Sequence, residues 1–177
     1  SVLASDRRAR WYARGMATQL AVSTDIDAPI DIVWARVTDI EHTADTIEAI
    51  KQIEMLSEPP HAPIRSGTKW RETRLMMGKE ATEEMWVTSV LPPEEGEQGS
   101  ATYHVGAFSH GTRYLSEIRL TTNPQGGTTL TYAFSGKAET LGAKILSPLG
   151  SLMKGAIRKC FEADLADIKR ACERVEA

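Results

Sequence analysis

One apolar stripe in the last third of the sequence constrains the fold more than any other feature. Its members recur at steps of three and four residues, the spacing of one face of an α-helix. They are Ile145, Leu149, Leu152, Met153, Ala156, Ile157, Phe161, Leu165, Ile168, Cys172 and Val175. At about 1.5 Å per residue, a helix from Pro148 to Val175 would be roughly 40 Å long. We therefore expect an extended structure, such as a whole sheet, to lie against it.

The first part of the chain predicts one strand and two short helices. Alternating apolar residues predict a strand over 19–26. Asp27 supplies an acceptor side chain near a helix cap and Pro29 suits the first turn, so a helix with an apolar face should follow. A second, weaker helical stretch is predicted over 42–50.

The middle of the chain alternates strand-like runs with turn residues, such as Gly78 and the segments 109–111 and 123–127. Further strands are predicted over 51–58, 68–77, 79–90, 101–108, 112–121 and 128–136. The expected fold class is α+β, with an antiparallel sheet of six to seven strands gripping one long C-terminal helix and two short helices after the first strand. A sheet that curves around a helix in this way usually encloses a cavity.

Size and composition favour one globular domain. The chain has 177 residues, of which 41% are hydrophobic and 25% charged. No apolar run approaches the length that a membrane span needs, so we expect a soluble protein without one. Cys160 and Cys172 lie twelve residues apart on the predicted helix, roughly 18 Å, which is too far for a disulfide. Their use suits a reducing compartment and predicts a cytoplasmic location.

The opening segment differs in charge from the rest of the chain. Residues 1–15 carry a net charge of +3, which leaves −6 for residues 16–177. We interpret 1–15 as a flexible vector-derived or translated upstream stretch, with a short basic targeting arm as the alternative. Residues 16–177 form the predicted domain. Its acidic balance argues against nucleic acid as a partner, because such binding depends on neutralising phosphates.

The order of strand, helix pair, six strands and long helix resembles the START-like SRPBCC superfamily, the polyketide cyclase/dehydrase and lipid-transport proteins with the helix-grip fold. The resemblance covers roughly Thr18 to Val175. Its local motifs are Ile26-Asp27-Ala28-Pro29, Val33-Trp34, Trp70-x-Glu72-Thr73-Arg74, Gly78-Lys79-Glu80-Ala81, Glu83-Glu84-Met85, Gly126-Gly127-Thr128 and Ala163-Asp164-Leu165. Membership implies a deep apolar cavity between the sheet and the long helix, but no fixed chemistry.

Four alternating residues of the strand over 68–77 are candidates for the cavity wall. Trp70, Glu72, Arg74 and Met76 share one face, and the bulk of Trp70 and Met76 predicts that this face points inward. Arg74 could then hold a carboxylate or enolate oxygen of a ligand, and Glu72 could act as a base. The alternative is that the two charges pair with each other or with Glu84, or that they lie in solvent.

Other candidates come from the later strands and the long helix. Tyr103, His104, His110 and Tyr114 should gather around the hairpin between the strands 101–108 and 112–121, with Tyr114 pointing inward. The histidines are either exposed or catalytic. Met153, Ile157 and Phe161 would line the cavity floor, although core packing alone explains them equally well.

The sequence carries no signal for metal or cofactor chemistry. The four histidines lack the spacing of metal ligands, and no nucleotide-binding glycine motif or nucleophile triad stands out. We expect no metal and no cofactor. Pro148 is either a gate beside the cavity mouth or simply a helix start.

Three functions remain open. The first is non-covalent binding of a hydrophobic or amphipathic small molecule, lipid or polyketide-like, in the internal cavity. The second is a cyclase or aromatase type of enzyme that uses acid and base groups of the same cavity. The third is a protein-interaction module, which would show an exposed apolar patch instead of a deep cavity. The sequence leaves the oligomeric state open.

Overall fold

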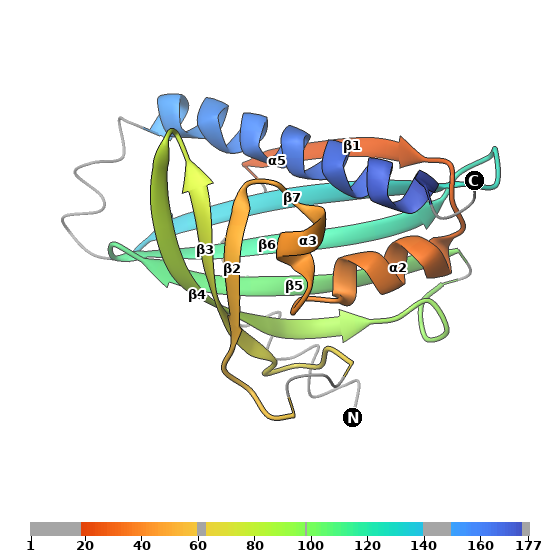
Figure 1. Cartoon of the computed structure of the whole chain (residues 1–177), viewed down its shortest axis with the longest axis horizontal. Coiled ribbons are helices and arrows are strands. Elements are labelled where there is room, and N and C mark those ends of the chain that lie inside the picture. Colours follow the sequence, from red (N-terminus) through yellow and green to blue (C-terminus); the bar gives the residue numbers. More distant parts are fainter. Residues whose placement is uncertain (1–18, 60–62, 98, 140–149, 175–177) are drawn as a thin grey trace.

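The computed structural model describes residues 19–59, 63–97, 99–139 and 150–174 and shows one antiparallel sheet curved around one long helix (Figure 1). The sheet has seven strands in the order β1-β7-β6-β5-β4-β3-β2. They are β1 (Leu20–Ile26), β2 (Ile50–Met55), β3 (Lys69–Met76), β4 (Lys79–Leu91), β5 (Ser100–Ser109), β6 (Thr112–Thr122) and β7 (Thr128–Ala138). The helices are α2 (Ile30–Thr38), α3 (Thr43–Thr46) and α5 (Gly150–Glu173). This is the predicted helix-grip fold.

Two tight hairpin turns set the register of the central strands. Met77 and Gly78 join β3 to β4, and His110 and Gly111 join β5 to β6, all four with φ between 49° and 76°. Two successive residues with positive φ form the turn whose twist suits an antiparallel hairpin. The turns pair Trp70 with Met85 and place alternate residues of each strand on the concave face.

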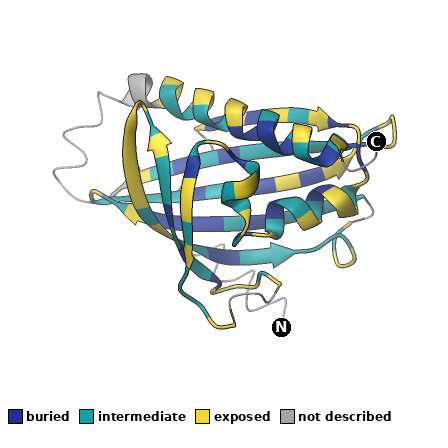
Figure 2. Cartoon of the chain, viewed as in Figure 1, coloured by how far each residue is buried: buried dark blue, intermediate teal, exposed yellow. Residues whose placement is uncertain are grey.

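The concave face and α5 bury the core between them (Figure 2). From α5, Leu165, Ile168 and Cys172 are almost fully buried, and Leu120 and Leu130 of the sheet are completely so. The helix α2 adds Val33 at one end. The described part of the apolar stripe therefore packs against the concave face of the sheet.

Two local predictions need correction. The helix predicted over 42–50 is only α3, because Ile47 is already extended and β2 begins at Ile50. Pro29, not Asp27, is the N-cap of α2, and no side chain caps that helix. The backbone N–H of Asp27 instead donates to Glu173 Oε1 over 2.9 Å, which ties the end of α5 to the end of β1.

Some predictions lie outside the described residues. They are the separate character of residues 1–15, the role of Pro148 as a gate or a helix start, and the stripe members Ile145, Leu149 and Val175. Within the described part of the chain, both cysteines are free thiols, and no helix is long and apolar enough to cross a membrane.

Candidate functional site

A cavity of about 130 Å³ lies between the concave face of the sheet and the helices α2, α3 and α5. Most of its wall is apolar. Representative wall residues are Val37, Ile47, Val105, Ile118, Phe161 and Ile168. In such an apolar wall, the few polar groups say most about the chemistry of the cavity.

Those polar groups centre on Arg74 of β3. Its Nη2 donates to both carboxylate oxygens of Asp164 on α5, each at 2.8 Å. Its Nη1 lies 3.6 Å from Glu72 Oε1, which is an ion pair without a short hydrogen bond. All three side chains are mostly buried, with exposed fractions of 13% for Arg74, 8% for Glu72 and 4% for Asp164. In this inner cluster, one buried cation therefore contacts two buried carboxylates.

Two donors of this cluster are unused. Trp70 Nε1 and Arg74 Nε are buried, and neither has a hydrogen-bond partner among the described residues. The indole lies close enough to Glu72 to lower the pKa of that carboxyl in part, although the geometry does not make a hydrogen bond. Buried donors without partners are rare in folded proteins.

The local sequence explains how the cluster forms. Glu72 and Arg74 are two residues apart on a strand, so both face the concave side together with Trp70. Asp164 follows Phe161 by three residues and precedes Ile168 by four, which puts it on the buried face of α5. Sequence reasoning missed Asp164 as a site residue. The available signal was a carboxylate inside the apolar stripe, next to Leu165.

Burial governs the ionisation of both acids. Loss of solvent raises the pKa of Glu72, and the attraction of Arg74 only partly offsets this while Asp164 adds repulsion. Loss of solvent also raises the pKa of Asp164 against the opposing effect of Arg74. A carboxyl group with a raised pKa exchanges protons more readily near neutral pH than an ordinary one.

Two tyrosines also belong to the polar part of the wall. The Tyr103 hydroxyl donates to the backbone oxygen of Val37 over 2.7 Å, linking β5 to α2. The ring of Tyr132, on β7, meets Phe161 edge-on with centroids 5.5 Å apart. Burial raises the pKa of both phenols well above the ordinary value, so both are neutral. Tyr132 is another wall residue that sequence reasoning did not single out.

The predicted site residues divide into two groups. Trp70, Glu72, Arg74, Tyr103 and Phe161 line the cavity. Met76 and Ile157 are half-buried outside the described wall. Tyr114 stacks on Phe134, with ring centroids 5.5 Å apart, and is also outside that wall. The side chain of Met153 lies outside the described residues. Ligand contact by any of them stays a prediction.

The expected cluster around the β5–β6 hairpin does not form. Only Tyr103 of that group reaches the cavity. His104, one residue on, faces the other side of the sheet, where its Nδ1 bonds Ser89 Oγ at 2.9 Å and its Nε2 lies 3.7 Å from Glu117. His110 sits exposed in the turn itself. Within the described chain, no three acidic, histidine or cysteine side chains come together as metal ligands would.

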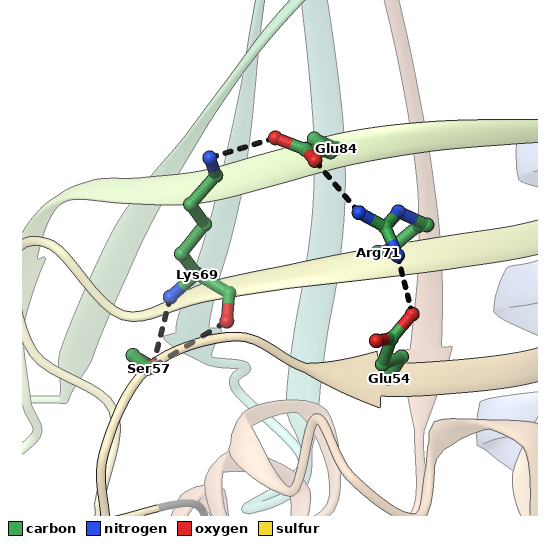
Figure 3. Close-up of polar contacts among 5 residues, drawn as sticks. All are labelled: Glu54, Ser57, Lys69, Arg71 and Glu84. Carbon is green, nitrogen blue, oxygen red and sulfur yellow. Dashed lines mark hydrogen bonds and ion pairs between the residues drawn. The ribbon is translucent and has the colours of Figure 1, made fainter.

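A second arginine network occupies the opposite face of the same strand (Figure 3). Arg71 contacts Glu54 of β2 at 2.5 Å and Glu84 of β4 at 3.0 Å, and Lys69 contacts Glu84 at 2.7 Å. These side chains are all about half exposed. Glu84, one of the predicted partners for the inner charges, belongs to this outer network. The prediction that Glu72 and Arg74 pair with each other agrees with the 3.6 Å contact.

The two arginines of β3 allow a matched test of burial. Replacing Arg74 with Met should lower the free energy of unfolding by about 3–5 kcal/mol, because two buried carboxylates lose their cation. Replacing Arg71 with Met should cost far less, since water solvates the exposed carboxylates that remain. Urea denaturation of both variants measures the difference. Equal losses would show that the inner cluster is not buried in solution.

The raised pKa of Glu72 gives stability a defined dependence on pH. A carboxyl whose pKa is higher in the folded state favours folding when it is protonated, and this contribution is lost as pH rises through the folded pKa. Replacing Glu72 with Gln should therefore raise the free energy of unfolding relative to wild type near neutral pH. The advantage should vanish as pH falls toward 4.5, the ordinary value.

Denaturation curves of both proteins across this range test the prediction, because their difference cancels the carboxylates that respond in the opposite sense, such as Glu84 and Glu117. A difference that grows as pH falls would contradict it.

Comparison with known proteins agrees with this architecture. Residues 17–173 match the family described as Polyketide cyclase / dehydrase and lipid transport. The comparison with curated proteins found no match.

Several solved structures share the fold at low sequence identity. The Zhui aromatase/cyclase from Streptomyces sp. R1128 has a TM-score of 0.68 and 19% identity, covering 92% of this chain and 96% of that one. A START superfamily protein from Mycobacterium smegmatis has a TM-score of 0.66 and 12% identity, covering 90% and 99%. A norcoclaurine synthase point mutant from Thalictrum flavum, in complex with a transition-state analogue, has a TM-score of 0.62 and 13% identity, covering 92% and 99%. With the family match over 17–173, the chain belongs to the polyketide cyclase/dehydrase and lipid transport family of the START-like SRPBCC superfamily.

Proposed function

We propose that the protein binds an amphipathic small molecule, non-covalently, in the cavity between the sheet and α5. The observation that carries this proposal is a largely apolar cavity whose wall holds two buried donors without partners, Trp70 Nε1 and Arg74 Nε. Apolar burial would supply most of the affinity, at roughly 25 cal/mol per Å². A polar group of the ligand would be oriented by the cluster around Arg74.

The volume of the cavity limits what it can enclose. An engineered protein cavity of about 150 Å³ holds benzene. The present cavity of about 130 Å³ therefore suits a ring-sized group. A long acyl chain or an extended polyketide would have to leave part of itself outside the described wall, or widen it.

The membership of the family supports the same proposal. Its description joins polyketide cyclases with lipid transport, and both activities handle largely apolar molecules. The free thiols Cys160 and Cys172 are consistent with the reducing cytoplasm as the place of action.

Filling the cavity tests ligand binding directly. Native mass spectrometry of protein from its own host should show a bound compound that denaturation releases for identification. Replacing Val105 with Phe should abolish its retention, because the added ring occupies the cavity. Replacing Thr102 with Phe adds the same ring to the other face of β5 and should leave retention intact. An unliganded wild type, or a V105F variant that still carries the compound, would count against the proposal.

A second candidate function is acid–base catalysis in the same cavity. It is favoured by the buried carboxyls of Glu72 and Asp164, whose pKa values are raised and which lie beside one arginine. Such groups can move a proton and stabilise an enolate. Two structures of the same fold come from enzymes, an aromatase/cyclase and a norcoclaurine synthase.

The compound identified above separates binding from catalysis. If the protein is an enzyme, it should convert that compound, and replacing Glu72 with Gln should lower turnover at least about a hundredfold. Binding of a neutral compound should change little, since the variant keeps the shape of the side chain. Product analysis and a binding titration on the same samples measure the two effects. Absence of turnover in the wild type would favour a carrier.

A further inference from the structure

In the cluster of Glu72, Arg74 and Asp164, the one arginine already binds a carboxylate of the protein itself. Arg74 Nη2 donates to both oxygens of Asp164, so the guanidinium does not offer a free paired face to a ligand carboxylate. Arg74 Nε has no hydrogen-bond partner among the described residues, and neither has Trp70 Nε1 on the same strand. Glu72 is held only by the 3.6 Å ion pair, which leaves its oxygens able to accept a hydrogen bond. The cluster therefore offers donors and an acceptor, but no spare positive charge.

The charges that act on Glu72 from neighbouring elements add to this effect. Asp164 from α5 and Glu83 from β4 both act on Glu72 as negative charges, and only Arg74 opposes them. Tyr103 and Tyr132 are neutral phenols. On the sheet side of the cavity, the carboxylates of Glu72 and Asp164 outnumber the one guanidinium of Arg74, so this side is net negative when both acids are ionised. An anionic ligand group placed there would be repelled.

Another cation lines the cavity from its helical side. Arg36 belongs to α2, and its Nη1 donates to Thr46 Oγ1 of α3 over 3.4 Å. This contact holds Arg36 on the helical side of the cavity, whereas Glu72 belongs to the sheet. An anionic ligand group could bind to Arg36 instead of near Glu72. An experiment must therefore distinguish binding at Arg36 from binding at Glu72.

We propose that Glu72 makes the cavity selective against anionic ligands and in favour of molecules that carry a hydroxyl or carbonyl oxygen. The oxygen accepts from Trp70 Nε1 or Arg74 Nε, and a hydroxyl donates to Glu72. This inference rests on the proposed binding function and names the chemical class of its ligand.

Three one-ring probes test the selectivity: toluene, phenol and benzoate. They share a ring of a size that the cavity can hold and differ in one substituent, which is apolar, hydroxyl or carboxylate. Titration followed by NMR of the backbone amides gives the affinity of each and places its binding site. We expect phenol to bind about tenfold more tightly than toluene and at least tenfold more tightly than benzoate.

The variant Glu72→Gln should gain affinity for the anionic probe. Removing one negative charge should strengthen benzoate binding about tenfold and leave toluene binding unchanged. The matched control is Glu80→Gln, which changes the net charge equally at an exposed position outside the cavity wall and should not alter any affinity. A gain cannot arise from misfolding, so the result does not depend on unchanged stability.

Wild-type affinity for benzoate should also fall as pH rises through the raised pKa of Glu72, because benzoate is then already ionised while Glu72 loses its proton. The dependence should be shallower in Glu72→Gln.

The outcomes separate this inference from the function on which it rests. If toluene and phenol bind but benzoate binds as tightly as phenol, or if Glu72→Gln brings no gain, the selectivity is wrong and cavity binding stands. Benzoate binding that disappears in Arg36→Gln would assign the anion to α2 and also overturn the selectivity. If none of the three probes binds at the cavity, the proposed function fails and the inference with it.

Discussion

The packing of α5 against the concave face of the sheet is the interaction on which the rest of the structure depends. The helix provides one long apolar face, and seven strands curve to cover it. Neither element could bury its apolar residues alone, so each requires the other. Since the helix does not fill the curve completely, the α2–α3 side retains a space. The site follows from this incomplete filling as much as from any residue in it.

Into that apolar space the chain places three charges, at a cost that packing must offset. A buried ion pair adds little net stability compared with apolar residues of the same shape. The arrangement of Glu72, Arg74 and Asp164, with one carboxylate held closely and one held loosely, is therefore better explained by what it does to a ligand or a proton than by folding. The outer network around Arg71 shows how the same strand handles similar charges where water is available.

Most of the fold could be predicted from periodicity, whereas the site could be predicted only in part. Alternation along β3 correctly placed Trp70, Glu72 and Arg74 on one inner face, because strand geometry leaves no other choice once Trp70 is buried. The partner of Arg74 could not be found in this way, since pairing across ninety residues depends on how α5 crosses the sheet. Tyr114 illustrates a second limit of sequence reasoning. Its strand was predicted, but the sequence does not show where along the sheet the cavity ends, and Tyr114 stacks on Phe134 outside the described wall.

The two arginines of β3 also help to specify the register of that strand in the sheet. Arg74 points inward and Arg71 outward, and each has its carboxylates waiting on its own side. A shift of β3 by one residue would reverse every side chain of the strand. Arg71 would then enter the apolar space, Trp70 would be left in water, and both sets of carboxylates would lose their cation. A register shift of β3 is therefore destabilising on both faces of the sheet. The charges that shape the site thus also favour the correct strand register.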